Sequence, residues 1–282
     1  VIPSTGRARP VIVLKRQELP PLLRAIHDPP KQLYLRGGCA PDLLERPAVA
    51  IVGARACSAY GAQVARMLGR ELAAAGLVVV SGLARGIDAE AHRGALETTG
   101  HTVAVLGCGI DRDYPAAHAT LAARIAERAF VVGEYEPGVE PAPWRFPARN
   151  RIIAGLCVAT IVVEARERSG ALITADFALE GGREVFAVPG EVTSALSAGT
   201  NSLLRLGATP LTSSGDVLES LGIEPETKER VSHPILDRLP ATIDELVRTT
   251  GLDAARVAAL LAELELDRAV AEGDGVYRAL GR

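Results

Sequence analysis

The chain has 282 residues, of which 48% are hydrophobic and 23% are charged, an ordinary globular composition with material for one large α/β domain and a small one. The formal net charge of −3 excludes a general attraction to nucleic acid, so any polyanion site must be a local patch. The cysteines are far apart and include no C-x-x-C pair, which argues against a zinc site or a disulfide framework. No apolar run reaches about 18 residues, and the start has no signal-peptide h-region. We therefore expect a reduced, cytoplasmic protein without a membrane span.

Residues 1–47 are rich in proline and poor in periodicity. A short strand is predicted at residues 33–35, between a turn and a pair of glycines. We expect this segment to be an N-terminal appendage packed on the main domain.

From residue 48 to residue 221, short apolar segments alternate with helical ones. Strands are predicted at 48–53, 77–82, 102–107, 130–133, 160–165 and 185–190. Helices are predicted at 61–75, 88–99, 116–128, 149–156, 171–180 and 201–206. This alternation is typical of right-handed βαβ units and a parallel sheet, and the unbroken apolar strands indicate that helices cover both of its faces.

Four of the predicted strands end in glycine, at Gly53, Gly82, Gly107 and Gly190. Ligands of open α/β sheets bind at the carboxyl ends of the strands, where glycine lets a backbone approach closely. We therefore expect a binding rim at these turns. The alternative, that the glycines only make tight βα turns, stays open.

Two of these turns carry groups that could hold an anion. Arg55 and Ser58 follow the first strand beside helix N–H groups, an arrangement that suits a phosphate, although Arg55 could equally form a salt bridge. Ser81 and Gly82 end the second strand and could present hydroxyl and N–H donors to an anion.

Three further polar residues lie in or just after these turns. Asp88 and Asp111 are predicted to cap the helices that follow. His92 is interpreted as a buried, satisfied histidine rather than a reactive one.

A cationic stretch with an aromatic pair precedes the fifth strand. Residues 141–155 contain three arginines and no acid, and the residues of interest are Trp144, Arg145, Phe146, Arg149 and Arg151. Aromatic faces beside arginines are typical of single-strand binding, where bases stack and phosphates are paired. The alternative is that Phe146 belongs to the core and that one arginine pairs with Glu134 or Glu164.

No catalytic motif is present. The chain lacks a dinucleotide fingerprint, a Walker loop, a nucleophile elbow and an H-E-x-x-H helix. Glu134 and Glu164 are the best carboxylate candidates, but neither has a partner at a defined spacing. We therefore predict no catalytic residue, no cofactor and no metal ion, and a site that holds an anion.

The C-terminal part reads as a linker at 222–233 and a winged helix at 234–282. Helices are predicted at 241–251, where Thr242 and Glu245 form a capping box, and at 252–268, where Asp253 is the N-cap. A hairpin follows at 269–280, turning at 273–275. Nine acidic residues and six arginines between Val231 and Arg282 favour a protein-interaction or structural role over duplex reading.

Several long motifs, in this order, resemble the DprA family of DNA-processing proteins of bacterial transformation. They are GARACSAYG, SGLARGIDAEAH, VLGCGIDRDYP, FPARNRIIAGL, VVEARERSGALITADFAL, VFAVPG and SAGTNSLLRLGA. The resemblance covers nearly the whole chain. It implies an extended Rossmann-like domain at 48–221, a homodimer, binding of single-stranded DNA without cutting it, and transfer of that strand to the RecA recombinase. Many members carry an upstream SAM-like domain, which we expect to be missing here because the sequence starts abruptly.

The family motifs and the cationic stretch together give the candidate DNA-binding residues: Arg55, Ser58, Ser81, Gly82, Arg145, Phe146, Arg149, Asn150, Arg151, Ser169, Gly170 and Thr174. One competing interpretation is a nucleotide-hydrolysing enzyme of the lysine-decarboxylase-like type, which carries a P-G-G-x-G-T loop. Here Glu191 stands where that loop continues in glycine, which weakens the enzyme interpretation. Another competing interpretation is a duplex-specific transcription factor that acts through the winged helix.

Overall fold

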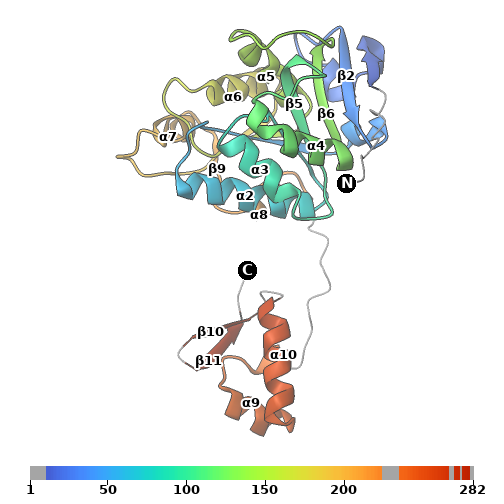
Figure 1. The fold of residues 1–282 in the computed structure, drawn as a ribbon. Coiled ribbons are helices and arrows are strands. Elements are labelled where there is room, and N and C mark those ends of the chain that lie inside the picture. Colours follow the sequence, from blue (N-terminus) through green and yellow to red (C-terminus); the bar gives the residue numbers. More distant parts are fainter. Residues whose placement is uncertain (1–10, 224–234, 267–269, 274, 280–282) are drawn as a thin grey trace. The chain divides into compact units, whose positions relative to one another are not determined.

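The computed structural model describes residues 11–223, 235–266, 270–273 and 275–279 (Figure 1). The chain divides into two compact units, Val1–Ile223 and Glu224–Arg282, which we describe separately. The linker predicted at 222–233 lies almost entirely outside the described residues.

The first unit is built on a nine-stranded sheet in the order β1-β2-β6-β5-β4-β3-β7-β8-β9. Its strands are β1 (Ile12–Lys15), β2 (Gln32–Gly37), β3 (Ala48–Val52), β4 (Val78–Ser81), β5 (Thr102–Gly109), β6 (Phe130–Tyr135), β7 (Ala159–Val162), β8 (Glu184–Ala187) and β9 (Thr209–Pro210). The strands from β6 to β9 along this order are parallel. Every residue of β3 and β5 is buried, as expected for strands that are covered on both faces.

Helices cover both faces of the sheet. One face packs against α1 (Pro21–Arg24), α5 (Arg145–Gly155), α6 (Gly170–Glu180) and α7 (Ala198–Arg205). The other packs against α2 (Ala59–Ala74), α3 (Ile87–Ala95), α4 (Ala119–Arg128) and α8 (Ser214–Ser220). Short 3-10 helices are η1 (Arg16–Glu18), η2 (Pro41–Glu45) and η3 (Ala116–His118). The predicted Rossmann-like α/β fold is confirmed.

The N-terminal segment differs from the predicted appendage. It supplies β1 and β2, and β2 pairs antiparallel with β6, so the sheet is mixed at this edge. Leu33 and Leu35 of β2 are fully buried, which makes the strand an integral part of the core. The prolines on either side of this short strand obscured its pattern in the sequence.

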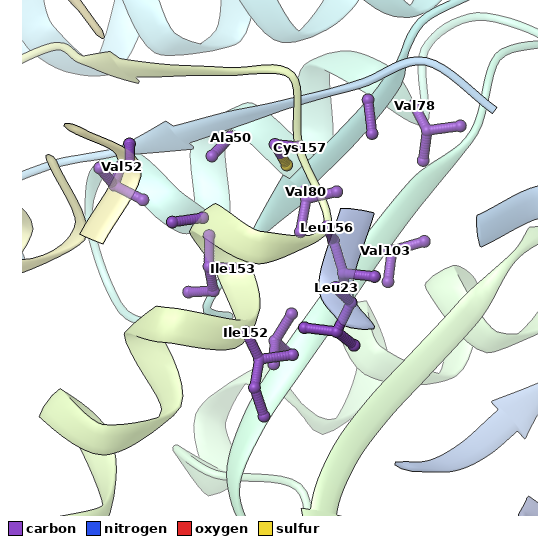
Figure 2. Close-up of a cluster of buried hydrophobic side chains, with 14 of the residues drawn as sticks. Leu23, Ala50, Val52, Val78, Val80, Val103, Ile152, Ile153, Leu156 and Cys157 are labelled. Atoms are coloured by element: carbon purple, nitrogen blue, oxygen red, sulfur yellow. The ribbon is translucent and has the colours of Figure 1, made fainter. Parts of the chain in front are cut away.

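Helix α5 begins at Arg145, four residues before the predicted start, because Pro147 falls in the first turn, where a missing N–H costs nothing. Its last turns are apolar and pack against the sheet. Figure 2 shows this cluster, in which side chains of α5 and of its C-cap, Leu156, lie beside valines of the strands: Ile152, Ile153, Val52, Val80 and Val103. The buried half of α5 thereby holds its polar first half at the ends of the strands.

The strand order creates a switch point between β3 and β7. From β3 the chain proceeds outward to β4, β5 and β6, whereas from β7 it proceeds the opposite way to β8 and β9. The crevice outside the carboxyl ends of two such strands is the usual ligand position in open α/β sheets. It lies here between the N-termini of α2 and α6.

The second unit contains η4 (Leu236–Arg238), α9 (Ile243–Thr250), α10 (Ala254–Leu266) and a hairpin of β10 (Val270–Gly273) and β11 (Val276–Ala279). Its apolar cluster includes Leu246, Val257 and Leu261. The predicted capping box at Thr242 is confirmed, and Asp253 accepts a hydrogen bond from the Arg256 N–H at 2.9 Å, as expected of an N-cap. Within the described residues of the chain, no helix is long and apolar enough to cross a membrane.

Candidate functional site

A cavity of about 200 Å³ opens at the carboxyl ends of the central strands, and we call it the rim cavity. It brings together side chains or backbone from the turn after β3 and from α5 and the start of α6. Seven of the predicted site residues line it: Arg55, Phe146, Arg149, Asn150, Ser169, Gly170 and Thr174. Sequence segments more than a hundred residues apart therefore meet at one rim, as the glycine-ended strands suggested.

An aromatic and cationic stack lies at the rim cavity, and two of its members, Arg55 and Phe146, line the cavity. The Arg55 guanidinium lies 5.7 Å from the centre of the Phe146 ring, and this ring stacks on Tyr114 at a centroid distance of 5.1 Å. A Cβ at Gly107 would lie 2.9 Å from the Phe146 ring, so glycine is needed there to seat the ring over β5. Phe146 is half-buried and lines the cavity, so it is not simply a core residue.

Tyr114 is a member of this stack that sequence reasoning missed. It is 44% exposed and follows β5 in the segment GCGIDRDYP. An aromatic residue in a predicted strand-end turn was the available signal.

Arg149 lies at the floor of the rim cavity and is only 5% exposed. Its Nη1 donates to the carbonyls of Gly82, at 2.9 Å, and Val105, while its Nε donates to the Asn150 side chain. No described residue accepts from its Nη2. Burial lowers the pKa of Arg149 to about 10, and the nearby Asp88 carboxylate acts in the opposite direction. The guanidinium is therefore charged at neutral pH, and it both ties two strand ends together and offers a donor edge to the cavity.

The other two arginines of α5 lie outside the rim cavity. Arg151 forms ion pairs with Glu134 at 2.7 Å and Asp28 at 3.0 Å, which confirms the alternative that one arginine of the stretch braces the fold. Burial opposes its charge, but these two carboxylates outweigh burial and raise the pKa of Arg151. Arg145 donates to the Glu140 carbonyl and lies over the rings of Tyr135 and Trp144.

Ser81 and Gly82 do not present free donors, so that prediction is wrong. The Ser81 hydroxyl is fully buried and donates to the Ile51 carbonyl at 2.6 Å. The N–H groups of Gly82 and Ala84 donate to the Asp88 carboxylate at 3.1 and 3.3 Å. The place of the expected anion is thus occupied by a side chain of the protein, and Gly82 instead makes room for Arg149.

The two aspartates predicted to cap helices stabilise loops. Asp88 lies inside α3, whose N-cap position is Gly86, and its carboxylate holds the preceding turn. Burial raises the pKa of Asp88, and Arg149 opposes this rise. Asp111 accepts from the Gly138 N–H at 2.9 Å.

Ser58 and Glu164 form a separate pair on the other side of the turn after β3. Ser58 caps α2 by accepting from the Gly61 N–H at 3.0 Å. Its hydroxyl and N–H donate to the two carboxylate oxygens of Glu164 at 2.5 and 2.9 Å. The negative charge of Glu164 therefore already compensates the positive N-terminus of α2, a pairing that the sequence did not reveal. Ser58 itself does not line the rim cavity.

The N-terminus of α6 adds positive potential to the rim cavity. Ser169 caps this helix by accepting from the Ala171 N–H at 3.3 Å, and nothing lies within 4 Å of the place where a Gly170 Cβ would be. The Asn150 amide donates to the Gly170 carbonyl at 3.0 Å and fixes α5 to α6. Two guanidinium groups and a helix N-terminus thus outweigh one carboxylate, Asp88, around the cavity.

His92 is fully buried outside the rim cavity, with Nδ1 2.6 Å from the Thr102 hydroxyl. Burial lowers the pKa of His92 to about 3, so the ring is neutral. This agrees with the interpretation of a buried histidine, although Nε2 has no partner among the described residues.

Comparison with known proteins identifies the family. The model of DNA recombination-mediator protein A matches residues 10–222, and that of the DprA winged helix domain matches residues 215–275. The chain is 48% identical to DNA processing protein DprA of Streptococcus pneumoniae over 196 residues, covering 70% of this chain and 68% of that protein. It is 42% identical over 268 residues to a putative DprA of Mycobacterium tuberculosis, covering 89% and 69%.

Two solved structures are similar. The X-ray structure of S. pneumoniae DprA matches with a TM-score of 0.71 and 45% identity, over 75% of each chain. A structure of Helicobacter pylori DprA, described for its single-stranded DNA binding mode, matches with a TM-score of 0.68 and 32% identity, over 75% of this chain and 95% of that one. A Rossmann-like sheet with this rim, followed by a winged helix, therefore makes this chain a member of the DprA family.

Proposed function

We propose that the protein binds single-stranded DNA at the rim cavity, holds it without cutting it, and delivers it to a RecA recombinase during natural transformation and homologous recombination. The observation that carries the proposal is the stack of Arg55, Phe146 and Tyr114, of which the first two line the same cavity as the buried Arg149. The reported single-stranded DNA binding of the H. pylori relative supports it.

The geometry suits a phosphate in the cavity and an unstacked base on the aromatic rings beside it. A space of about 200 Å³ between Arg55, Arg149 and the start of α6 can take a phosphate group with charge-assisted hydrogen bonds. The exposed Tyr114 ring and the half-buried Phe146 ring offer a stacking surface, which a base can reach only when it is not paired and stacked in a duplex. The site therefore selects the single strand by shape.

Delivery to RecA and homodimer formation rest on membership of the family and on the recombination-mediator domain that the chain matches. Light scattering at micromolar concentration should give the mass of a dimer, and a monomer mass would exclude this part of the proposal. RecA filament formation on a strand coated with this protein is the assay for delivery.

A fluorescence-anisotropy titration tests the binding proposal. We expect labelled oligothymidine to bind more tightly than a duplex of equal length, with little dependence on sequence. Arg55→Ala should weaken this binding, whereas Arg124→Ala, an exposed arginine on α4, should not. Equal affinity for single strand and duplex, or equal loss in both variants, would refute the proposal.

We infer that holding, rather than hydrolysis, is the activity. Both oxygens of Glu164, the best buried carboxylate of the strand-end turns, accept hydrogen bonds from Ser58, and Glu191 stands where the related hydrolases carry glycine. Incubation with nucleoside monophosphates should release no base. Release that disappears on changing Glu164 or Glu191 would make the hydrolase the better assignment.

A further inference from the structure

A second aromatic and cationic cluster lies outside the rim cavity, at the end of β6. The Arg145 guanidinium carbon lies 5.0 Å from the centre of the Tyr135 ring and 4.9 Å from the centre of the Trp144 ring. We call these three residues the outer platform. None of them lines the rim cavity, and the proposed phosphate position does not involve them.

Arg145 holds the outer platform together through its contacts with the two rings. Its Nη1 donates to the Glu140 carbonyl, whereas its Nε is buried and has no hydrogen-bond partner among the described residues. Both ring centres lie within the distance of about 6 Å at which a cation and an aromatic ring attract each other, and tryptophan attracts most strongly. Arg145 is therefore a positioning residue, which ties the Trp144 ring to the end of β6.

The segment that carries Trp144 is fixed in place before any ligand arrives. Pro141 and Pro143 restrict the backbone that leads into α5. The Arg145 N–H donates to the Ala142 carbonyl at 3.0 Å, and Trp144 is the N-cap residue of the helix. The ring therefore loses little conformational entropy when a ligand binds to it.

The Trp144 ring is open to a ligand. It is 63% exposed even though Arg145 lies over it, and tryptophan side chains are highly buried on average. Tryptophan is enriched at interfaces, where its large flat ring contributes much contact area. A ring that is held in place and left uncovered is thus suited to a flat, unsaturated partner.

The outer platform continues the proposed DNA site from β5 to its neighbour β6 (Figure 1). Phe146, two residues after Trp144, is seated over Gly107 of β5, and Tyr135 of β6 lies in register with Gly109 of β5. Two residues of a strand span about 7 Å. One or two nucleotides of a single strand cover this distance, since stacked nucleotides rise by about 3.4 Å each.

The charges around the outer platform allow a DNA strand to pass. Glu134 forms an ion pair with Arg151 at 2.7 Å, and this pair compensates its charge. Glu140 forms one with Arg112 at 2.8 Å. Glu136 is exposed, so water and salt screen its charge. The one arginine of the platform lies over its rings, so the platform contributes base stacking rather than phosphate pairing.

From this arrangement we infer that the outer platform binds a base of the single strand, which stacks on the Trp144 ring beside the base held by Phe146 and Tyr114. Such stacking accepts any base, because every base has a π face. The bound strand therefore leaves the rim cavity over β5 and β6, away from β7. This inference rests on the proposed binding of single-stranded DNA, since the base belongs to the same strand.

Fluorescence of the full chain tests the inference directly. Trp144 is the only tryptophan in the sequence, so intrinsic tryptophan fluorescence reports on this ring alone. We expect oligothymidine to quench the fluorescence, and the quenching to saturate at the same concentration as the anisotropy of a labelled strand. Oligothymidine that binds by anisotropy without quenching would overturn the inference and leave the proposed function intact. Oligothymidine that does not bind at all would overturn both.

Substitution of Trp144 separates stacking from phosphate pairing. Trp144→Ala should weaken oligothymidine binding by about five- to 150-fold, the equivalent of one stacked base, and leave the slope of log affinity against log salt concentration unchanged. Trp144→Phe keeps a flat ring and should retain most of the affinity. Full affinity in Trp144→Ala, or a salt slope that falls in magnitude, would contradict stacking on this ring.

Tyr60→Ala is the matched control. Tyr60 is also an exposed aromatic residue, at 54%, and it does not line the rim cavity. Its removal should leave the affinity for oligothymidine unchanged. A loss as large as that in Trp144→Ala would show that exposed rings act alike wherever they lie, and the outer platform would then have no special role.

Discussion

Replacing Arg149 by methionine should abolish much of the DNA affinity while costing little stability. The variant removes two hydrogen bonds to the carbonyls of Gly82 and Val105. Leaving two buried carbonyls without donors costs about 2–6 kcal/mol in total, at about 1–3 kcal/mol each.

Removing the buried charge recovers part of this lost unfolding free energy. The pKa of Arg149 falls from 12.5 to about 10 chiefly through burial. At about 1.4 kcal/mol for each tenfold change in proton affinity, holding the charged form in the fold costs about 3 kcal/mol, which Arg149→Met recovers. The net loss of unfolding free energy should therefore lie between about −1 and 3 kcal/mol.

Urea unfolding followed by circular dichroism measures the stability, and anisotropy titrations of oligothymidine across a salt series measure the binding. We expect the slope of log affinity against log salt concentration to fall in magnitude by about 0.7, the contribution of one phosphate of a single strand. Arg151→Met is the control, since Arg151 pairs with Glu134 and Asp28 outside the cavity and should leave the salt slope unchanged. An unchanged slope in Arg149→Met, or a stability loss above about 5 kcal/mol, would refute this reasoning and make Arg149 purely structural.

Three further outcomes are expected. Phe146→Leu should weaken oligothymidine binding by about 1–3 kcal/mol, the contribution of one stacked base, and an unchanged affinity in anisotropy titrations would remove the ring from the interface. The pKa of His92 in the folded protein is about 3, below the ordinary 6.5, so protonation below pH 6.5 favours the unfolded state and should lower the unfolding free energy by up to about 1.4 kcal/mol for each pH unit. His92→Leu should show a shallower decline of the unfolding free energy in urea titrations from pH 7 to pH 5. An equal decline in the variant and the unchanged protein would contradict the assignment. Gly61→Ala places a Cβ 2.4 Å from the Glu164 carboxylate and should lower the melting temperature, whereas Gly170→Ala meets nothing within 4 Å and should not; equal melting temperatures would show that the Ser58 and Glu164 pair can shift without cost.

The order of the parallel elements could be predicted because each central strand is an unbroken apolar run and each turn is marked by glycine. β3 and β5 show this, since both are buried along their whole length. The strand β2 was only partly predicted, because a segment between prolines carries too few residues for a period to be recognised, and its pairing with β6 depends on residues about a hundred positions away.

The candidate site shows the same limit at the level of side chains. Residue type alone placed Arg55 and Phe146 at the rim, but it could not separate Arg149 from Arg151, which are two residues apart on one helix. Their roles are set by distant partners, the carbonyl of Gly82 for one and the carboxylate of Glu134 for the other. The number of free hydrogen-bond donors at the strand ends was overestimated for the same reason, because the Asp88 carboxylate accepts the hydrogen bond of the Gly82 N–H.

The antiparallel pairing of β2 with β6 has a consequence for the way the chain folds. Residues 32–37 lie beside residues 130–135, so one side of the sheet cannot be completed until nearly half of the chain has left the ribosome. The entropy cost of closing so long a loop must be met before the β2–β6 contacts can stabilise the fold. By contrast, β3, α2 and β4 are neighbours in sequence and can assemble early. We therefore expect the central strands and α2 to form the nucleus. The β1–β2 pair is local, so only the other edge of β2 should stay open, and prone to aggregation, until β6 pairs with it.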